Sequence, residues 1–142
     1  MKLIYPLLAG FLLAPSCGCG EGDSRLAPVS GTIRYNGKPL ANAYVGFWPE
    51  EKGVRAASGS TDANGFYRLT TFEASDGATI GQHRVMVRAE EKADGPPMPA
   101  DDINFKRGKL LTAARYSNGD TSGLTAEVIA RKNNVIDFNL SD

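Results

Sequence analysis

Hydrophobic and polar residues alternate with a period of two along most of the chain after residue 28. Because successive side chains of a β-strand point to opposite faces of the sheet, this alternation predicts half-buried strands. The clearest predicted strand covers residues 29–35. Asn36 and Gly37 follow it directly, and both residue types tolerate the positive φ angles of a two-residue hairpin turn.

Six further strands are predicted from the same alternation. They cover residues 43–48, 54–61, 66–72, 81–89, 124–129 and 135–140. In the first of these, Val45 and Phe47 share one face of the strand, and Tyr44 and Trp48 share the opposite face. The stretch 54–61 is mostly Ala, Ser and Gly, which predicts a weak strand at the edge of a sheet.

Turn residues separate the predicted strands. Asp62, Asn64 and Gly65 predict a tight turn, because an Asp side chain accepts hydrogen bonds from backbone N–H groups two residues on and glycine takes a positive φ without strain. Asn133 and Asn134 predict a hairpin turn between the last two strands.

The alternation fails between residues 90 and 123. We expect a short helix or strand fragment here, with residues 109–114 as its best stretch. So long an excursion is uncommon in a compact domain, and long loops often carry function. The simpler interpretation is a loop over one end of the fold.

Seven short strands separated by turn signals predict an all-β fold, a seven-stranded antiparallel Greek-key sandwich with one long loop excursion. Continuous helical periodicity is missing from the sequence, so helical bundles and α/β folds are disfavoured. The residues expected between the two sheets are Val45, Phe47, Tyr67, Leu69, Val85, Val87, Val128, Ile136, Phe138 and Leu140.

Composition narrows the classes of function. The 142 residues suit one domain, and 16 Lys and Arg residues balance 16 Asp and Glu residues. This neutral balance argues against a nucleic-acid partner. One His and two Cys are too few for a zinc finger or a His-rich metal centre, so we expect no metal and no cofactor.

The N-terminus has the features of a signal peptide. Lys2 precedes an apolar stretch at residues 3–14, and these 12 residues are too few to cross a bilayer, which requires about 20. The following residues, Ala-Pro-Ser-Cys at 14–17, resemble a bacterial lipobox, in which the cysteine is lipidated and becomes the new N-terminus. Cys19 provides a second register for the same processing.

The lipobox resemblance implies a signal peptide over residues 1–16, a lipid on Cys17 or Cys19, and a flexible tether over residues 17–27. The folded domain then covers residues 28–142. The expected location is the cell envelope, lipid-anchored to a membrane. The alternatives are a soluble secreted or periplasmic protein cleaved near Ser16 and an uncleaved anchor.

Two stretches carry a family resemblance. VSGTIRYNGKPLANA at residues 29–43 and GSTDANGFYRL at residues 59–69 resemble carboxypeptidase regulatory-like domains, which are related to transthyretin (prealbumin). GQHRV at 81–85 and TSGLTAEV at 121–128 resemble a subgroup of small lipoproteins common in planctomycete-type bacteria. The resemblance implies an Ig/prealbumin-like sandwich over about residues 28–140. Fold alone does not specify an activity.

The candidate chemistry is sparse. Asp62 and Asn64 are oxygen donors, but Ca²⁺ takes six or more oxygen ligands, so a structural role in the turn is favoured. His83 is the single histidine and is expected to be buried or at an interface. One histidine supplies neither the zinc ligands of a carboxypeptidase nor the site of a transthyretin-like hydrolase, and the sequence has no G-x-S-x-G nucleophile elbow. We therefore expect no catalytic residues and no enzyme activity.

Tyr44 and Trp48 are the candidate binding surface. If they are exposed, they form an aromatic platform for sugar rings or a partner protein. The alternative is that other residues cover this face. The sequence thus predicts a non-catalytic, envelope-anchored binding or structural module whose partner is an envelope protein or a polysaccharide. The alternatives are an accessory subunit that docks on a secreted or envelope enzyme, and a small-molecule binder in the manner of transthyretin dimers.

Overall fold

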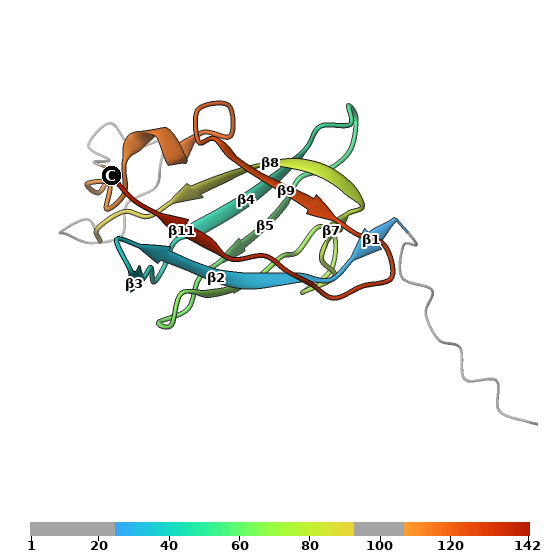
Figure 1. Ribbon diagram of the computed structural model, residues 1–142, viewed down its shortest axis with the longest axis horizontal. Coiled ribbons are helices and arrows are strands. Elements are labelled where there is room, and N and C mark those ends of the chain that lie inside the picture. Colours follow the sequence, from blue (N-terminus) through green and yellow to red (C-terminus); the bar gives the residue numbers. More distant parts are fainter. Residues whose placement is uncertain (1–24, 93–106) are drawn as a thin grey trace, which may run out of the picture.

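The computed structural model describes residues 25–92 and 107–142, which fold into two facing β-sheets with a two-stranded sheet at one end (Figure 1). The strands are β1 Leu26–Ala27, β2 Val29–Tyr35, β3 Lys38–Pro39, β4 Tyr44–Pro49, β5 Ala57–Ser60, β6 Phe66–Arg68, β7 Ala78–Thr79, β8 Gly81–Arg88, β9 Leu124–Val128, β10 Asn134–Val135 and β11 Phe138–Leu140. A 3-10 helix, η1, covers Ala114–Ser117. The prediction of an all-β chain is confirmed. In these two segments, no helix has the length and apolar character needed to cross a membrane.

One sheet has the strand order β5-β4-β8-β9, and each neighbouring pair is antiparallel. The predicted edge position of residues 54–61 is confirmed, although β5 is shorter than the predicted strand. β4 extends one residue further than predicted, because Pro49 still pairs with His83 of β8. Alternation along β4 buries Val45 and Phe47 against the second sheet.

The second sheet is built around β2. This strand pairs antiparallel with β3 and β6, and parallel with β10 and β11 near the end of the chain. The prediction of a purely antiparallel sandwich is therefore wrong for this sheet, since alternation identifies the buried face of a strand but not its partner or direction. In Figure 1, the first long strand and the last therefore run side by side.

The predicted hairpin at Asn133 and Asn134 is wrong, because β9 belongs to one sheet and β10 to the other. The side chain of Asn134 is buried and binds backbone groups of the connection between the two sheets. Its Oδ1 atom accepts the Ile129 N–H at 2.9 Å, and its Nδ2 atom donates to the carbonyl oxygens of Ile129 at 3.1 Å and Lys132 at 3.0 Å. Arg131 takes a left-handed backbone conformation in the same turn, with φ 56°.

The predicted strand at residues 66–72 ends early, at Arg68. Beyond it, the carboxylate of Asp76 accepts the backbone N–H groups of Thr71, Phe72 and Glu73 at 2.7, 2.9 and 2.8 Å. These donors therefore bind a side chain instead of a neighbouring strand, and the backbone turns.

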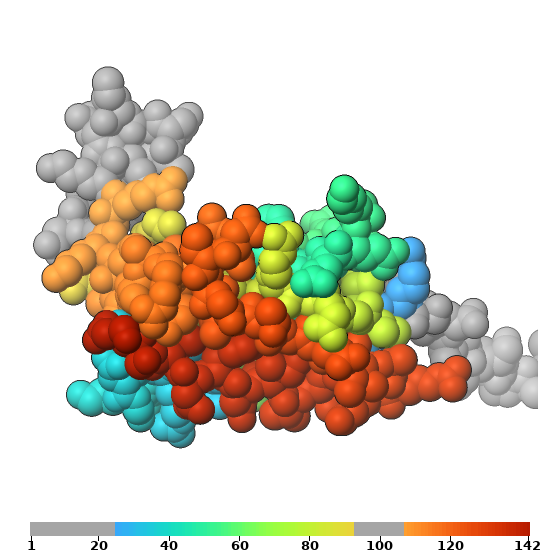
Figure 2. Space-filling model, turned by 45° about the horizontal axis from the view of Figure 1, so that its top comes forward, coloured from blue at the N-terminus to red at the C-terminus, as the bar shows by residue number. Residues whose placement is uncertain are grey.

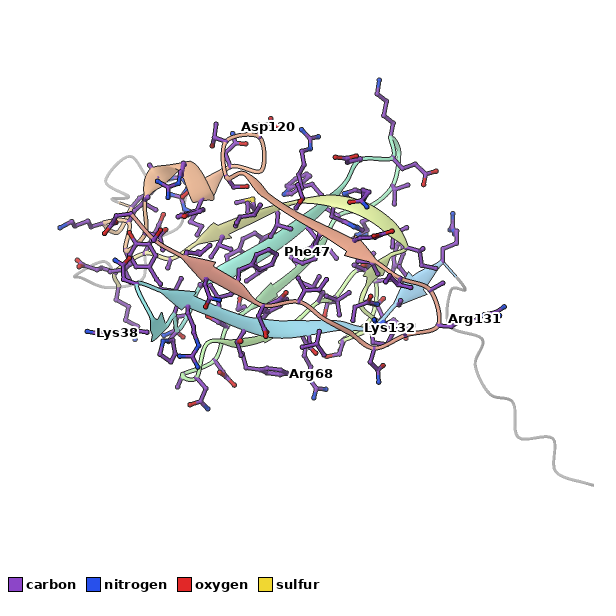
Figure 3. All side chains as sticks on the ribbon, viewed as in Figure 1. Lys38, Phe47, Arg68, Asp120, Arg131 and Lys132 are labelled. Carbon is purple, nitrogen blue, oxygen red and sulfur yellow. The ribbon has the colours of Figure 1, made fainter. Side chains whose placement is uncertain are left out.

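The core lies between the two sheets, with Phe47 near its centre (Figure 3). The ring centroid of Phe47 lies 6.3 Å from that of Tyr67, 5.7 Å from that of His83 and 6.2 Å from that of Phe138. All ten predicted core residues are buried or packed against the core, so this prediction is confirmed.

Part of the long excursion returns to the sheet. The N–H of Glu91 donates to the carbonyl of Lys109 at 2.9 Å, and the N–H of Leu111 donates to the carbonyl of Ala89 at 2.9 Å. The chain then forms η1 and a loop before β9. In the space-filling view, these orange residues stand beside the yellow-green residues of β8 (Figure 2). Residues 93–106 of the excursion lie outside the described part.

Candidate functional site

Tyr44 and Trp48 lie on the outer face of the four-stranded sheet. Tyr44 is 43% exposed and Trp48 is 49% exposed, while Val45 and Phe47 between them are fully buried. The sequence placed these two pairs on opposite faces of the strand, and the structure agrees. Rings with this much exposure leave apolar surface in contact with water. They therefore mark a candidate contact surface.

Gly46 forms the floor between the two aromatic residues. A Cβ atom at this position would lie 3.2 Å from Cε1 of Tyr44, 3.3 Å from Nε1 of Trp48 and 3.1 Å from Cγ of Met86. Met86 is the residue opposite Gly46 on β8. Two rings and a thioether side chain therefore converge over one glycine and form a continuous apolar strip, which we call the aromatic strip (Tyr44, Gly46, Trp48 and Met86).

Two arginines border the aromatic strip. The antiparallel register places Arg84 opposite Trp48 and Arg88 opposite Tyr44. Arg84 forms an ion pair with Asp120, and Arg88 forms one with Glu90. The charge of each guanidinium is thus balanced by an adjacent carboxylate.

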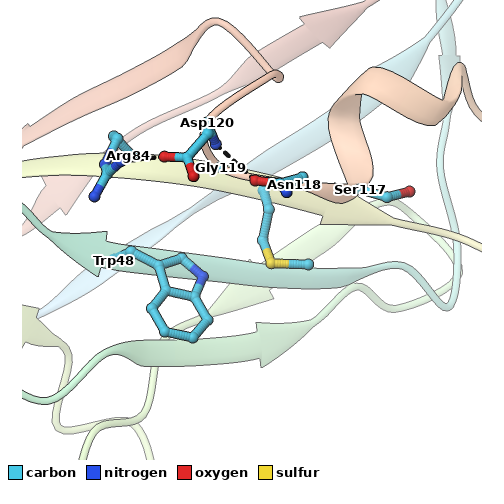
Figure 4. A pocket seen from close by; sticks show the side chains of 7 residues that line it. Trp48, Arg84, Ser117, Asn118, Gly119 and Asp120 are labelled. Carbon is cyan, nitrogen blue, oxygen red and sulfur yellow. Dashed lines mark hydrogen bonds and ion pairs between the residues drawn. The ribbon is translucent and has the colours of Figure 1, made fainter.

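A hollow of about 340 Å³ opens at the Trp48 end of the aromatic strip. Figure 4 shows Trp48 on one side of it and the Arg84–Asp120 ion pair on the other. Its lining residues are Trp48, Arg84, Met86, Ser117, Asn118, Gly119 and Asp120. The hollow thus combines an aromatic wall with donors and acceptors on a loop.

Hydrogen bonds hold this loop against the sheet. The hydroxyl of Ser122 donates to the carbonyl of Val85 on β8 at 2.5 Å, and the hydroxyl of Thr121 donates to the carbonyl of Arg115 at 2.8 Å. Oδ1 of Asn118 accepts the N–H of Asp120 at 2.8 Å. Hydrogen bonds within the protein therefore hold the loop that carries the polar wall in a defined position.

His83 faces the interior and does not reach the aromatic strip. It is 1% exposed, and its Nδ1–H donates to the carbonyl of Gly81 at 3.1 Å. Nε2 is buried, with no hydrogen-bond partner in the described residues. Burial lowers the pKa of His83 below its ordinary value, and this effect exceeds the opposing effects of the Gly81 carbonyl and the Glu50 carboxylate.

The turn residues lie where a backbone reversal requires them. Asn36 and Gly37 have φ angles of 49° and 80° between β2 and β3. Oδ1 of Asp62 accepts the N–H groups of Asn64 at 2.8 Å and of Phe66 at 3.0 Å. Gly65 has a φ of 76°. Across residues 25–92 and 107–142, no three His, Cys, Asp or Glu side chains are grouped so that they could hold a metal ion.

Sequence reasoning missed the polar wall of the hollow. Arg84 and Met86 alternate with the buried positions of β8, but nothing in the sequence shows that they lie opposite Trp48 and Gly46. Asp120 is 36 positions away from Arg84, in a stretch without periodicity. The lipidation candidates Cys17 and Cys19 lie outside the described residues.

Comparisons with known proteins give little. No protein-family model matches the chain, and no curated protein matches it. Among solved structures, a 9R-lipoxygenase from Cyanothece PCC8801 aligns with 83% of this chain at 16% identity and a TM-score of 0.39. The chain spans only 16% of the length of that lipoxygenase. A likeness at this level carries no inference about this chain.

Proposed function

We propose that this chain is a non-catalytic binding module, held at the cell envelope by an N-terminal lipid, and that the aromatic strip contacts its partner. The observation that supports the proposal is the exposure of Tyr44 and Trp48 beside a preformed hollow. An apolar strip with polar groups at its border has the composition of a recognition surface.

The proposed family is that of the carboxypeptidase regulatory-like domains, within a small lipoprotein of the planctomycete type. The proposed architecture is the Greek-key, Ig/prealbumin-like sandwich over residues 28–142. Two facing sheets, and the positive φ angles of Gly37 and Gly65 in the two motif turns, support it.

A non-catalytic role is supported by the placement of His83. Its ring packs against Phe47 in the core, with only 1% of the residue exposed. General acid–base catalysis requires a group within hydrogen-bonding reach of the substrate. A ring in this position does not meet a substrate at the aromatic strip.

The proposed anchor is a lipid on Cys17 or Cys19, after cleavage before that cysteine. The predicted tether of residues 17–27 is too long at its C-terminal end, because Leu26–Ala27 form β1, pair with β7 and bury Ala27 to 1% exposure. The first described strand, β1, lies at the end of the molecule away from the C-terminus (Figure 1). A tether attached there leaves the aromatic strip on the side of the sandwich, accessible to a partner in the envelope.

The anchor is tested by separating membrane and soluble fractions of cells that express the tagged full chain. We expect the wild-type chain in the membrane fraction and the Cys17→Ser, Cys19→Ser double variant in the soluble fraction. The two single variants identify which cysteine is acylated. Retention of the double variant in the membrane would refute the lipid anchor.

The binding surface is tested by photo-crosslinking in intact cells. The photoreactive residue p-benzoylphenylalanine replaces Tyr44 in one variant and Phe72 in another. Phe72 is a matched control because it is aromatic, 58% exposed and absent from the lining of the hollow beside Trp48. We expect a crosslinked product from position 44 and none from position 72. One discrete protein product would indicate an accessory subunit, and a polysaccharide ladder would indicate glycan binding. Equal crosslinking at both positions would reject the aromatic strip as the binding surface.

A further inference from the structure

The hollow beside Trp48 has two kinds of wall. The indole ring of Trp48 and the side chain of Met86 are apolar, and Arg84, Asn118 and Asp120 are polar (Figure 4). A pyranose sugar has the same division, because its ring faces expose C–H groups and its rim carries hydroxyl groups. An aromatic ring packs well against such a C–H face.

The polar wall has unused capacity for hydrogen bonds. A guanidinium carries five N–H donors and a carboxylate has about four acceptor sites, so one ion pair between Arg84 and Asp120 leaves most of them free. The side chain of Arg84 is 47% exposed and that of Asp120 is 68% exposed, so these groups remain accessible. A donor next to an acceptor matches a pair of adjacent sugar hydroxyls, each of which donates and accepts.

The charges of the surface are paired, so the surface offers no net attraction to an anionic ligand. Arg84 is balanced by Asp120, and Arg88 is balanced by Glu90, whose Oε1 accepts the Arg88 Nε–H at 2.6 Å. A carboxylate or sulfate on the ligand would have to displace one of these protein carboxylates or lie next to it. A neutral ligand binds to this wall without displacing either carboxylate.

The length of the aromatic strip favours a chain over a single sugar. Tyr44 and Trp48 are four positions apart on β4, which corresponds to about 13 Å along a strand. This distance exceeds the size of one pyranose ring. The hollow of about 340 Å³ lies within the range of about 300–1,000 Å³ of small-molecule sites.

We infer that the ligand is a chain of neutral pyranose sugars, with one ring stacked on Trp48 and its hydroxyl groups bound by Arg84 and Asp120. This inference rests on the proposed function, since it names the partner of the same surface.

The single tryptophan of the chain makes the test specific, because all indole fluorescence comes from Trp48. The purified domain with its tether is titrated with cellohexaose, xylohexaose, mannohexaose and chitohexaose, and with oligogalacturonate as the anionic probe. We expect a saturable change in emission with at least one neutral hexasaccharide and a weaker response to oligogalacturonate. Added salt should leave the affinity for the neutral sugar unchanged, since no net charge is neutralised on binding.

Variants locate the contacts. Arg84→Ala and Asp120→Ala should each weaken binding about tenfold, the effect of losing one or two hydrogen bonds. Phe72→Ala, which removes an exposed ring elsewhere, should bind as the wild type. Trp48→Ala removes the fluorophore, so its affinity is measured by titration calorimetry and should be lost, while Trp48→Tyr should retain part of it. Circular dichroism confirms that each variant is folded.

Two results would overturn the inference: no neutral hexasaccharide alters the emission of the folded protein, or oligogalacturonate binds more tightly than all of them. Crosslinking from position 44 separates this failure from that of the proposed function. A discrete protein product without sugar binding would leave the binding module intact and reject the glycan. Equal crosslinking at positions 44 and 72 would reject both.

Discussion

The hydroxyl of Tyr67 donates a 2.6 Å hydrogen bond to the backbone carbonyl of Ile136. It joins β6 to the segment between β10 and β11, and Tyr67 is only 1% exposed. Burial raises the pKa of Tyr67 far above its ordinary value, so the hydroxyl stays protonated and remains a donor. One buried phenol thus links β6, which pairs with β2, to the segment between β10 and β11, which also pair with β2.

Replacing Tyr67 with Phe should destabilise the fold by about 1–3 kcal/mol, because the Ile136 carbonyl loses a buried partner. The free energy of unfolding is measured by urea denaturation. Tyr44→Phe is the control, since Tyr44 is exposed and its substitution should change stability by no more than about 0.5 kcal/mol. Equal stabilities of the two variants would show that the buried hydrogen bond contributes nothing.

Gly31 allows β2 and the Ile136 segment to approach each other closely. A Cβ atom at Gly31 would lie 1.8 Å from the carbonyl oxygen of Ile136. We expect Gly31→Ala to cost at least about 2 kcal/mol of stability, since a rigid backbone atom must move. Gly119→Ala is the matched control, with its nearest contact, Cβ of Arg84, at 3.6 Å. Thermal unfolding compares the two, and a wild-type midpoint for Gly31→Ala would contradict the close packing.

His83 should make stability depend on pH. Burial lowers its pKa in the folded state, whereas in the unfolded chain the value is about 6.5. Below about pH 6.5 the unfolded chain binds a proton that the folded chain does not. The free energy of unfolding therefore falls as pH drops from about 6.5 toward the folded-state pKa.

Urea denaturation at a series of pH values across this window measures the effect. His83→Leu removes the titrating group, so its free energy of unfolding should vary less with pH than that of the wild type. An identical pH profile in the variant would assign the dependence to other groups.

The carboxylate of Asp76 should stabilise the fold through the hydrogen bonds that it accepts from backbone N–H groups. Burial alone would raise the pKa of Asp76, but the N–H groups of Glu73, Thr71 and Phe72 outweigh it and hold the pKa below its ordinary value. The stabilisation is present above about pH 3.9 and is lost as pH falls through the folded-state pKa. Asp76→Asn should cost about 1–3 kcal/mol at neutral pH. Glu73→Gln, on the same turn, is the control in chemical denaturation, and a similar loss in both variants would contradict this role.

The sequence predicted the faces of strands better than their partners. Residues 29–35 alternate cleanly and end at Asn36 and Gly37, so both boundaries of β2 were predicted correctly. The last two strands also alternate, but their connection depends on the buried side chain of Asn134. A local pattern does not show which atoms that amide will bind.

The candidate contact surface was predicted in part. The exposure of Tyr44 and Trp48 follows from their alternation with the buried Val45 and Phe47. The polar wall depends on the register between β4 and β8 and on a loop that returns to the sheet near Val85. Both are long-range pairings, and periodicity carries no information about them.

The parallel pairing of β2 with β10 and β11 has a mechanical consequence. A pulling force applied to the residues before Leu26 is transmitted along β2. This direction is parallel to β10 and β11, to which β2 is hydrogen-bonded. In this shear geometry, the bonds to β6, β10 and β11 resist together, whereas a force across the strands would break them one at a time. A pull between the start of β2 and the end of β11 would thus load these hydrogen bonds in shear.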